Sequence, residues 1–178
     1  MRISTRSEYG LRALMELGME PAHALSLRDI AQRQCISLDY LEQIMPALKT
    51  AGIICARRGA QGGYMLAKPA EIITVYDVLA ALEGTLDPMM CLSSGVPAMP
   101  QEQDSHGLST QGHGPHGEAC GASGNCTVQE VWREVRDAIE TVLRRLTLAS
   151  LIERQQRRYG GPIRTYSDHE IMRLVVFN

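Results

Sequence analysis

Three cysteines near the middle of the chain are the side chains best suited to chemistry. Cys120 and Cys126 enclose the segment CGASGNC, and Cys91 lies upstream of them. Five residues between two thiolates do not suit a short zinc knuckle, which usually has the spacing C-x2–4-C. A wider spacing on a glycine-rich segment lets thiolates reach around an iron–sulfur cluster, whose irons prefer soft sulfur ligands. The residues alone leave three interpretations open: a cluster, a cluster-free thiol switch, and a zinc site or no site.

The two remaining cysteines are interpreted differently. Cys35 lies in a short turn between two expected helices, and Cys55 lies between Ile54 and Ala56 on an expected strand. Buried free cysteines usually behave as small hydrophobic residues. We therefore expect both thiols to be buried and to take no part in the site.

Length and composition limit the kind of protein that carries these thiols. The chain has 178 residues, enough for one domain, or a domain with an appendage, that folds without disulfides. Its first residues, MRISTRSEYGLRALMELGM, contain charges in every apolar stretch, which does not fit a signal peptide, and no apolar run approaches the ~20 residues of a membrane span. We expect a cytoplasmic protein, where paired cysteines indicate metal or redox chemistry rather than structural disulfides.

The charge is distributed unevenly along the chain. The net charge is −2, but residues 1–70 hold nine Lys and Arg against six Asp and Glu, whereas residues 69–132 hold eight acids and no Lys or Arg. A chain segregated in this way can bind DNA through its basic end. The sequence has no nucleotide-binding loop, no paired catalytic acids and no nucleophile elbow. An iron–sulfur or thiol redox enzyme is therefore only a distant alternative.

The N-terminal half predicts the elements of a winged helix. Apolar spacing favours a helix over residues 3–18, Ser26 and Asp29 fit the start of a second helix, and Ser37 fits the start of a third. Pro46 should kink or shorten this third helix. IICARR and YMLAK, separated by a glycine-rich loop, are typical of a β-hairpin. This order predicts a mainly α fold, with a helix-turn-helix and a small β-hairpin wing.

The same order predicts which side chains meet DNA. The second helix of a helix-turn-helix presents its N-terminal residues to the major groove, where Gln43 can read adenine and Glu42 can accept a hydrogen bond from cytosine. Ser37 can also serve only as a cap. Arg58 on the wing can reach a phosphate or the minor groove, whereas Arg57 should point to the opposite face of its strand. The expected DNA-binding residues are Arg2, Arg28, Ser37, Leu38, Asp39, Tyr40, Glu42, Gln43, Lys49, Arg58, Gln61 and Gly62.

The second half predicts a loop that follows the winged helix. Thr74 and Asp77 fit a capping box for the last helix of a DNA-binding domain over residues 1–84. Residues 85–126 should form a loop that carries the three central cysteines, and it is a cluster-binding loop under the first of the three interpretations. Within it, residues 92–119 are rich in Gly, Ser, Pro, Gln and His, and we expect them to be disordered.

A long helix is expected over residues 127–150, opened by a capping box of Thr127 and Glu130. Its apolar residues alternate by four and three, and this heptad seam predicts dimerisation; packing on its own domain is the alternative. The expected dimer-interface residues are Val128, Trp132, Val135, Ile139, Val142 and Leu146. The tail, residues 151–178, is basic and then apolar and receives no predicted role.

Several blocks of the sequence together resemble the Rrf2 family of bacterial regulators. They are MRISTRSEYGLRAL, ISLDYLEQIMPALKTAGII and RRGAQGGYMLAKPAEIITVYDVLAALEG, followed by three cysteines before VWREV. The resemblance covers about residues 1–150, and SLDYLEQ with the RGxxGGY wing is its most specific part. It implies a homodimeric winged-helix transcriptional regulator, expected to be a repressor, that binds a palindromic operator in double-stranded DNA. Many members hold an iron–sulfur cluster, [4Fe–4S] or [2Fe–2S], that senses redox, nitric oxide or iron status.

The resemblance also implies which residues hold that cluster. Cys91, Cys120 and Cys126 match the three cysteine ligands, although 28 residues separate the first two here and the family usually has a short spacing. In some members a histidine three residues after the last cysteine is the fourth ligand, and this chain has Gln129 there.

Other members use an acid near the N-terminus, supplied by the partner subunit, and the matching residue is Glu8. An ordinary ion pair between Glu8 and Arg12, one helical turn apart, is the alternative. Further candidates for the fourth ligand are the loop histidines His106, His113 and His116.

Overall fold

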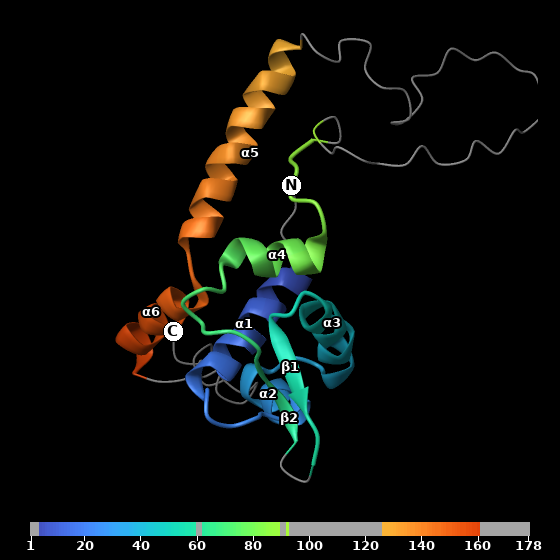
Figure 1. The fold of residues 1–178 in the computed structure, drawn as a ribbon, viewed down its shortest axis with the longest axis vertical. Coiled ribbons are helices and arrows are strands. Elements are labelled where there is room, and N and C mark those ends of the chain that lie inside the picture. The colour runs from blue at the N-terminus through green and yellow to red at the C-terminus, as the bar shows by residue number, and fades with distance from the viewer. Residues whose placement is uncertain (1–3, 60–61, 90–91, 93–125, 161–178) are drawn as a thin grey trace, which may run out of the picture. The chain divides into compact units, whose positions relative to one another are not determined.

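The computed structural model describes residues 4–59, 62–89, 92 and 126–160 (Figure 1). Its elements are α1 (Thr5–Met19), α2 (Leu27–Gln34), α3 (Leu38–Thr50), β1 (Ile54–Arg57), β2 (Gly63–Leu66), α4 (Val75–Glu83), α5 (Thr127–Arg145) and α6 (Leu148–Tyr159). The described residues fall into two compact units, one within residues 85–139 and a larger one that joins those within residues 4–84 to those within 140–160. We call the larger unit the head.

Short polar side chains begin the helices of the head where the sequence predicts. The Ser26 hydroxyl accepts a hydrogen bond from the Asp29 N–H (3.1 Å), and the Ser37 hydroxyl accepts one from the Tyr40 N–H (3.2 Å). Thr74 and Asp77 form the complete capping box at the start of α4. These bonds satisfy amide groups that have no partner inside a helix, so the predicted starts of α2, α3 and α4 are confirmed.

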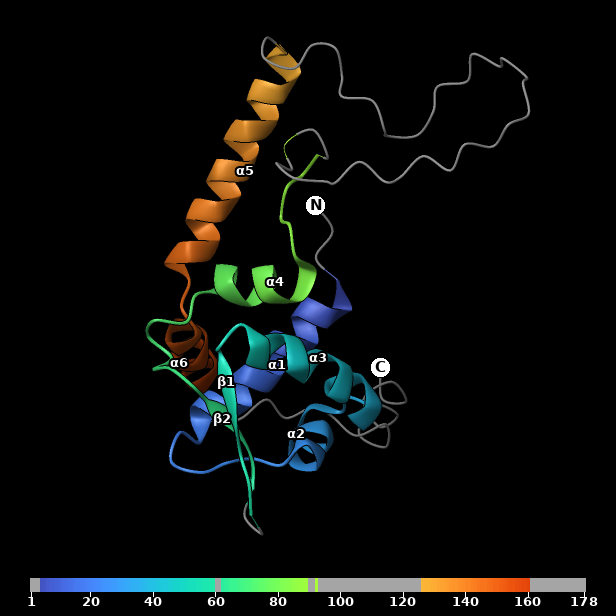
Figure 2. The same ribbon diagram turned by 45° about the vertical axis from the view of Figure 1, so that its right-hand side comes forward.

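Helix α1 is the centre of the head, and in both views α4 and α6 lie beside it (Figures 1 and 2). Two glycines allow this close approach. A Cβ on Gly10 would lie 2.3 Å from Leu82 Cδ1, and a Cβ on Gly18 would lie 2.4 Å from Ile152 Cδ1. The buried side chains of α1 then pack against those of α3, α4 and α6 in one hydrophobic core.

The hairpin is antiparallel, and its register runs from Ile54 opposite Leu66 to Arg57 opposite Gly63. Leu25, which precedes α2, adds a short third segment. Its N–H and C=O pair with the C=O and N–H of Tyr64 at 2.9 and 2.8 Å. The wing is therefore tied to the start of the helix-turn-helix as well as to the end of α3, and the winged-helix prediction is confirmed.

The expected single helix over residues 127–150 is wrong. Helix α5 ends at Arg145, Leu146 lies outside it, and Thr147 caps α6. The main chain is extended here because it pairs with the segment before α4. The Val75 N–H donates to the Leu146 carbonyl, and the Leu148 N–H donates to the Ile73 carbonyl, both at 2.8 Å.

The first part of the expected tail consequently belongs to the head. Helix α6 buries Leu148 and Ile152 in the same core as α1.

The start of α5 also differs from the prediction by one residue. Thr127 already lies inside the helix, and the Glu130 N–H donates to the carbonyl of Cys126 at 3.2 Å. The residue that precedes α5 is therefore the cysteine itself.

Pro46 does not shorten α3, because the helix continues to Thr50, and a kink at Pro46 stays a prediction. Pro46 is exposed, as is Glu42 one turn earlier. The Glu42 carbonyl, which loses its helical partner to the proline ring, therefore lies on the solvent side of α3.

Glu83, the last residue of α4, anchors the start of α1. Its Oε1 accepts hydrogen bonds from the Ser4 N–H (3.2 Å) and from the hydroxyls of Ser4 and Ser7 (2.5 Å each). Burial raises the pKa of Glu83, but these hydrogen bonds outweigh that effect, and the pKa is lowered overall. A carboxylate with a lowered pKa stabilises the folded state above its unfolded pKa, and this contribution is lost as the pH falls through the folded pKa.

We expect Glu83→Ala to lower the free energy of unfolding by about 1–2 kcal/mol at neutral pH, because the fully buried Ser7 hydroxyl loses its acceptor. The difference from the unmodified chain should shrink as the pH falls below the ordinary glutamate pKa of about 4.3. Urea unfolding at several pH values measures both effects. Glu71→Ala, at an exposed position, is the control. If Glu83→Ala and Glu71→Ala lowered the free energy of unfolding equally, Glu83 would not anchor the start of α1.

Candidate DNA interface and thiol site

Helix α3 presents one polar face outside the core. The opposite side of the helix is buried through Leu41, Ile44, Met45 and Leu48. The exposed residues recur at helical spacing and are Asp39, Glu42, Gln43, Pro46, Lys49 and Thr50. This face therefore contains four of the predicted DNA-binding side chains. Pro46 and Thr50 also lie on it and were missed, although the spacing of the apolar residues indicates them.

Two other predicted contacts at the start of α3, Ser37 and Tyr40, also have structural roles. The Ser37 hydroxyl is the cap of α3, which supports the alternative interpretation of that residue. Leu38 is half-buried. The Tyr40 ring packs edge-on against Tyr9 of α1, with 5.6 Å between ring centroids and 83° between planes. Tyr40 therefore stabilises the contact between α1 and α3, and most of its ring is turned away from solvent.

Exposed basic side chains lie on α2 and on the wing, both of which neighbour α3. Arg28 on α2 is exposed, as are Arg57 and Arg58 at the end of β1. The Gly62 N–H closes the wing by donating to the Gly59 carbonyl at 2.9 Å. A Cβ on Gly62 would lie 2.6 Å from the Arg57 carbonyl oxygen, so this turn requires glycine. Arg2 and Gln61 lie outside the described residues.

We expect Arg58→Ala to weaken binding to all DNA sequences by a similar factor, about 3- to 10-fold, and to reduce the salt slope by about one unit. The reason is that a phosphate contact contributes attraction without reading bases. Fluorescence anisotropy across a salt titration measures the slope. Arg154→Ala, an exposed arginine on α6, is the control. Unchanged affinity of the Arg58 variant at every salt concentration would exclude this wing contact.

One of the three central thiols lies in the described part of the chain. Cys126 is half-buried, forms no disulfide with another described cysteine, and directly precedes the 19-residue helix α5. The N-terminus of a helix carries a partial positive charge, which favours an anionic group bound beside it. Cys91, Cys120 and the histidines His106, His113 and His116 lie outside the described residues. Within the described part of the chain, three or more potential metal-ligating side chains do not come together.

Glu8, the other expected ligand, is exposed near the start of α1. Its Oε1 lies 3.6 Å from Nη1 of Arg12, and 62% of its side chain is accessible. The ion pair expected as the alternative interpretation is therefore present. An exposed pair of this kind contributes only a few tenths of a kcal/mol, so it does not prevent the carboxylate from binding another group.

The expectation that Cys35 is buried is wrong. Cys35 is exposed and ends α2 in a left-handed conformation with φ of 49°. The chain reverses at this residue, and Ile36 takes the buried position that follows. Cys55 is half-buried on β1, so its expected burial is only partial.

Helix α5 carries an apolar seam but contains no buried residue. Val128 is 62% exposed and Val142 is 45% exposed. Trp132, Val135 and Ile139 are only half-buried. The seam residues that lie within α5 are therefore available for another surface to cover. Leu146 lies one residue beyond the end of the helix, and its N–H still donates to the Val142 carbonyl at 3.3 Å.

Two buried polar residues of the head are missed by sequence reasoning. Glu16 on α1 and Gln34 at the end of α2 are fully buried, and Gln34 Nε2 donates to Glu16 Oε1 at 2.6 Å. Arg12 donates to Gln34 as well. The sequence feature that indicates this pair is Glu16 itself, a charged residue inside the apolar run ALMELGM, because an acid buried there without a partner would be costly.

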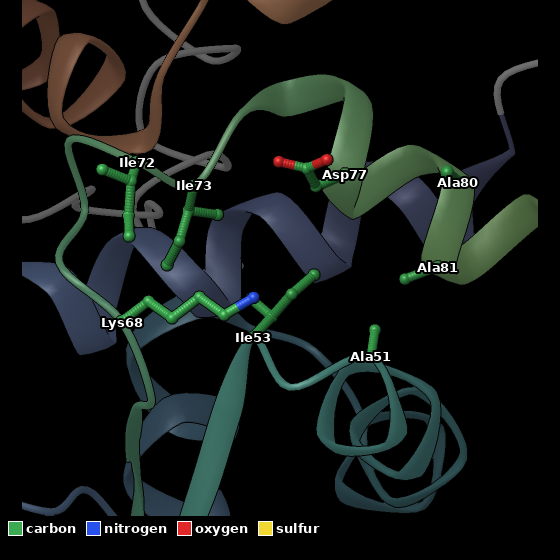
Figure 3. Close-up of a pocket in the computed structure, with 8 residues that line it drawn as sticks. All are labelled: Ala51, Ile53, Lys68, Ile72, Ile73, Asp77, Ala80 and Ala81. Carbon is green, nitrogen blue, oxygen red and sulfur yellow. The ribbon is translucent and has the colours of Figure 1, made fainter.

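A pocket of about 270 Å³ lies between the end of α3, the base of the hairpin and α4 (Figure 3). Its lining is mainly apolar, with one Lys and one Asp: Ala51, Ile53, Lys68, Ile72, Ile73, Asp77, Ala80 and Ala81. One oxygen of Asp77 already accepts the capping hydrogen bonds of Thr74. Among these lining residues no side chain is a nucleophile held by a base, so the pocket does not resemble a catalytic site.

Among the described residues, none of the helices is both long enough and apolar enough to cross a membrane. The head combines a helix-turn-helix, a hairpin wing and a polar α3 face, and these features define a winged-helix DNA-binding protein.

Comparison with known proteins identifies the family. Residues 3–154 match the family model described as "Rrf2: Iron-dependent Transcriptional regulator". The chain is 35% identical over 153 residues to protein rrf2 of Nitratidesulfovibrio vulgaris, covering 85% of this chain and 87% of that protein. The chain belongs to the Rrf2 family, and it is a DNA-binding transcriptional regulator rather than an enzyme.

Solved structures support the same assignment. The structure of T. potens IscR has a TM-score of 0.63 and 27% identity, with 95% of each chain covered. The oxidized form of Staphylococcus aureus CymR has a TM-score of 0.58 and 31% identity, covering 86% of this chain and 97% of that chain.

Proposed function

We propose that this regulator is a homodimeric repressor whose operator binding is controlled by an iron–sulfur cluster, [4Fe–4S] or [2Fe–2S]. Its ligands are Cys91, Cys120, Cys126 and, from the partner subunit, Glu8. The observation that carries the proposal is Cys126, a thiol outside any disulfide with a described cysteine, placed directly before α5 in a family described as iron-dependent.

The described donors fit such a group chemically. The half-buried Cys126 thiol lies beside a helix N-terminus, and the Glu8 carboxylate is exposed and held by a surface ion pair. Three thiolates and one carboxylate form a donor set that iron accepts, with the carboxylate as the weakest and most easily displaced member. When bound, the cluster supplies a redox-active centre that reacts with oxygen or nitric oxide.

The dimer is proposed from the seam of α5. A helix with a heptad stripe and no buried residue is stable when another apolar surface covers it, and a second copy offers the matching stripe. Two heads related by twofold symmetry would place two α3 helices about one DNA turn apart, which predicts a palindromic operator in double-stranded DNA. Such a regulator acts in the cytoplasm.

Helix α1 connects the Glu8 site to the DNA surface within the head. Arg6 donates to the Gln43 carbonyl at 3.5 Å, and Tyr9 packs on Tyr40. Binding of Glu8 to the cluster, or its release, would therefore shift α1 relative to α3. A shift between two head geometries requires only a few kcal/mol of differential binding.

The test uses the full chain purified without oxygen. Visible absorbance together with DNA binding that changes when the absorbance is bleached supports the proposal. The alternative function, a thiol–disulfide switch, predicts no visible absorbance and DNA binding that responds to oxidant and is restored by dithiothreitol. That alternative is retained because a neighbour in this family, CymR, was solved in an oxidized form.

A further inference from the structure

A set of polar side chains joins α1 to the turn of the helix-turn-helix. Gln34 Nε2 donates to Glu16 Oε1 at 2.6 Å, and Arg12 Nε donates to Gln34 Oε1 at 2.9 Å. A second guanidinium nitrogen of Arg12, Nη2, donates to the main-chain carbonyl of Gln34 at 2.5 Å. We name Arg12, Gln34 and Glu16 the α1 clamp.

The α1 clamp acts where the chain changes direction between α2 and α3. Gln34 is the last residue of α2, Cys35 follows in a left-handed conformation, and Ser37 begins α3. A non-glycine residue with positive φ is uncommon and persists where its surroundings hold it. Two hydrogen bonds from one arginine to Gln34, one to the side chain and one to the backbone, hold the residue just before this turn.

Arg12 also reaches the first turn of α3 by a second route. Its guanidinium lies over the Tyr9 ring, 5.4 Å from the centroid, and Tyr9 contacts Tyr40 edge-on. One side chain of α1 therefore contacts the end of α2 directly and the start of α3 through Tyr9. The apolar core also holds α3, but apolar contacts have no preferred direction, whereas the planar fork of an arginine defines one.

We propose that Arg12 and Gln34 are positioning residues for sequence-specific DNA recognition. They set the angle at which the exposed face of α3 meets base edges. This inference rests on the proposed role of α3 as the helix that reads DNA. Hydrogen bonds to base edges depend steeply on distance and angle, whereas attraction to phosphates is long-ranged. Loosening the clamp therefore lowers specific affinity and leaves non-specific affinity unchanged.

The experiment compares two duplexes: one enriched from a random library by the unmodified full-length protein, and one of the same composition in scrambled order. Arg12→Lys keeps the charge but cannot make both bonds to Gln34. Arg12→Lys should weaken binding to the enriched duplex about 10-fold, which corresponds to the loss of one hydrogen bond between α3 and a base edge. Binding to the scrambled duplex and the salt slope should stay unchanged. Gln34→Met removes the side-chain acceptor and should act in the same direction.

The double variant Arg12→Lys with Gln34→Met should bind the enriched duplex no more weakly than the weaker single variant, because both substitutions break one unit. Measurements at 10 °C, corrected for the folded fraction by circular dichroism, separate positioning from instability. Arg154→Lys is the control. Equal losses on both duplexes, or no loss on the enriched duplex, would overturn the proposal.

Gln43→Ala, on the exposed face of α3, tests the proposal on which this one rests. If Gln43→Ala leaves the ratio of specific to non-specific affinity unchanged, α3 is not the reading helix, and the proposed DNA interface fails. If Gln43→Ala lowers this ratio and both clamp variants leave it unchanged, only the positioning role fails.

Discussion

Ile139→Asp should convert the proposed homodimer to a monomer. Ile139 lies at the centre of the seam along α5, and a carboxylate there would be buried without a partner in each of two copies. A buried unpaired charge costs about 3 kcal/mol or more, so the dimer dissociation constant should rise by at least about 100-fold. Operator affinity should fall with it, because a monomer contacts one half-site.

Sedimentation velocity at micromolar concentration measures the dimer directly. Thr141→Asp, on the opposite face of α5, is the matched control and should remain dimeric. A tight Ile139→Asp dimer would show that the seam packs against its own chain rather than a second copy. In that case the palindromic operator would lose its structural basis.

Cys126→Ala should abolish the visible absorbance of protein purified or reconstituted without oxygen. A thiolate ligand cannot be replaced by a methyl group, and Cys126 is the proposed ligand beside the N-terminus of α5. Cys120→Ala should have the same effect, since the two come from one short segment. Cys91→Ala should abolish or weaken the absorbance, because 28 residues separate Cys91 from Cys120.

The remaining cysteines provide controls on the same chain. Cys35→Ala and Cys55→Ala should keep the full absorbance, and this comparison is demanding because Cys35 is exposed and open to adventitious metal. Glu8→Ala should retain the three thiolates but shorten the lifetime of the absorbance in air. Full absorbance in Cys120→Ala after anaerobic reconstitution would show that the CGASGNC segment is wrongly assigned as the part of the chain that holds the cluster.

Local sequence patterns determined the winged helix. Ser26, Ser37 and Thr74 begin their helices because a short hydroxyl side chain satisfies free amides two or three residues ahead, and this interaction needs no distant partner. The hairpin follows from strand-forming residues on either side of a glycine loop. The face of α3 that stays exposed also follows from apolar spacing alone.

Long-range contacts decided the features that the sequence did not predict. The seam pattern runs past Leu146, but α5 ends before it because the backbone there pairs with residues 73–75, far away in sequence. Tyr40 has the position of a base-reading residue, yet its ring packs against Tyr9. Glu16 and Gln34 are polar, and each is buried because the other provides a hydrogen-bonding partner from a different helix. In each case the partner lies many residues away, and only the tertiary fold brings the two together.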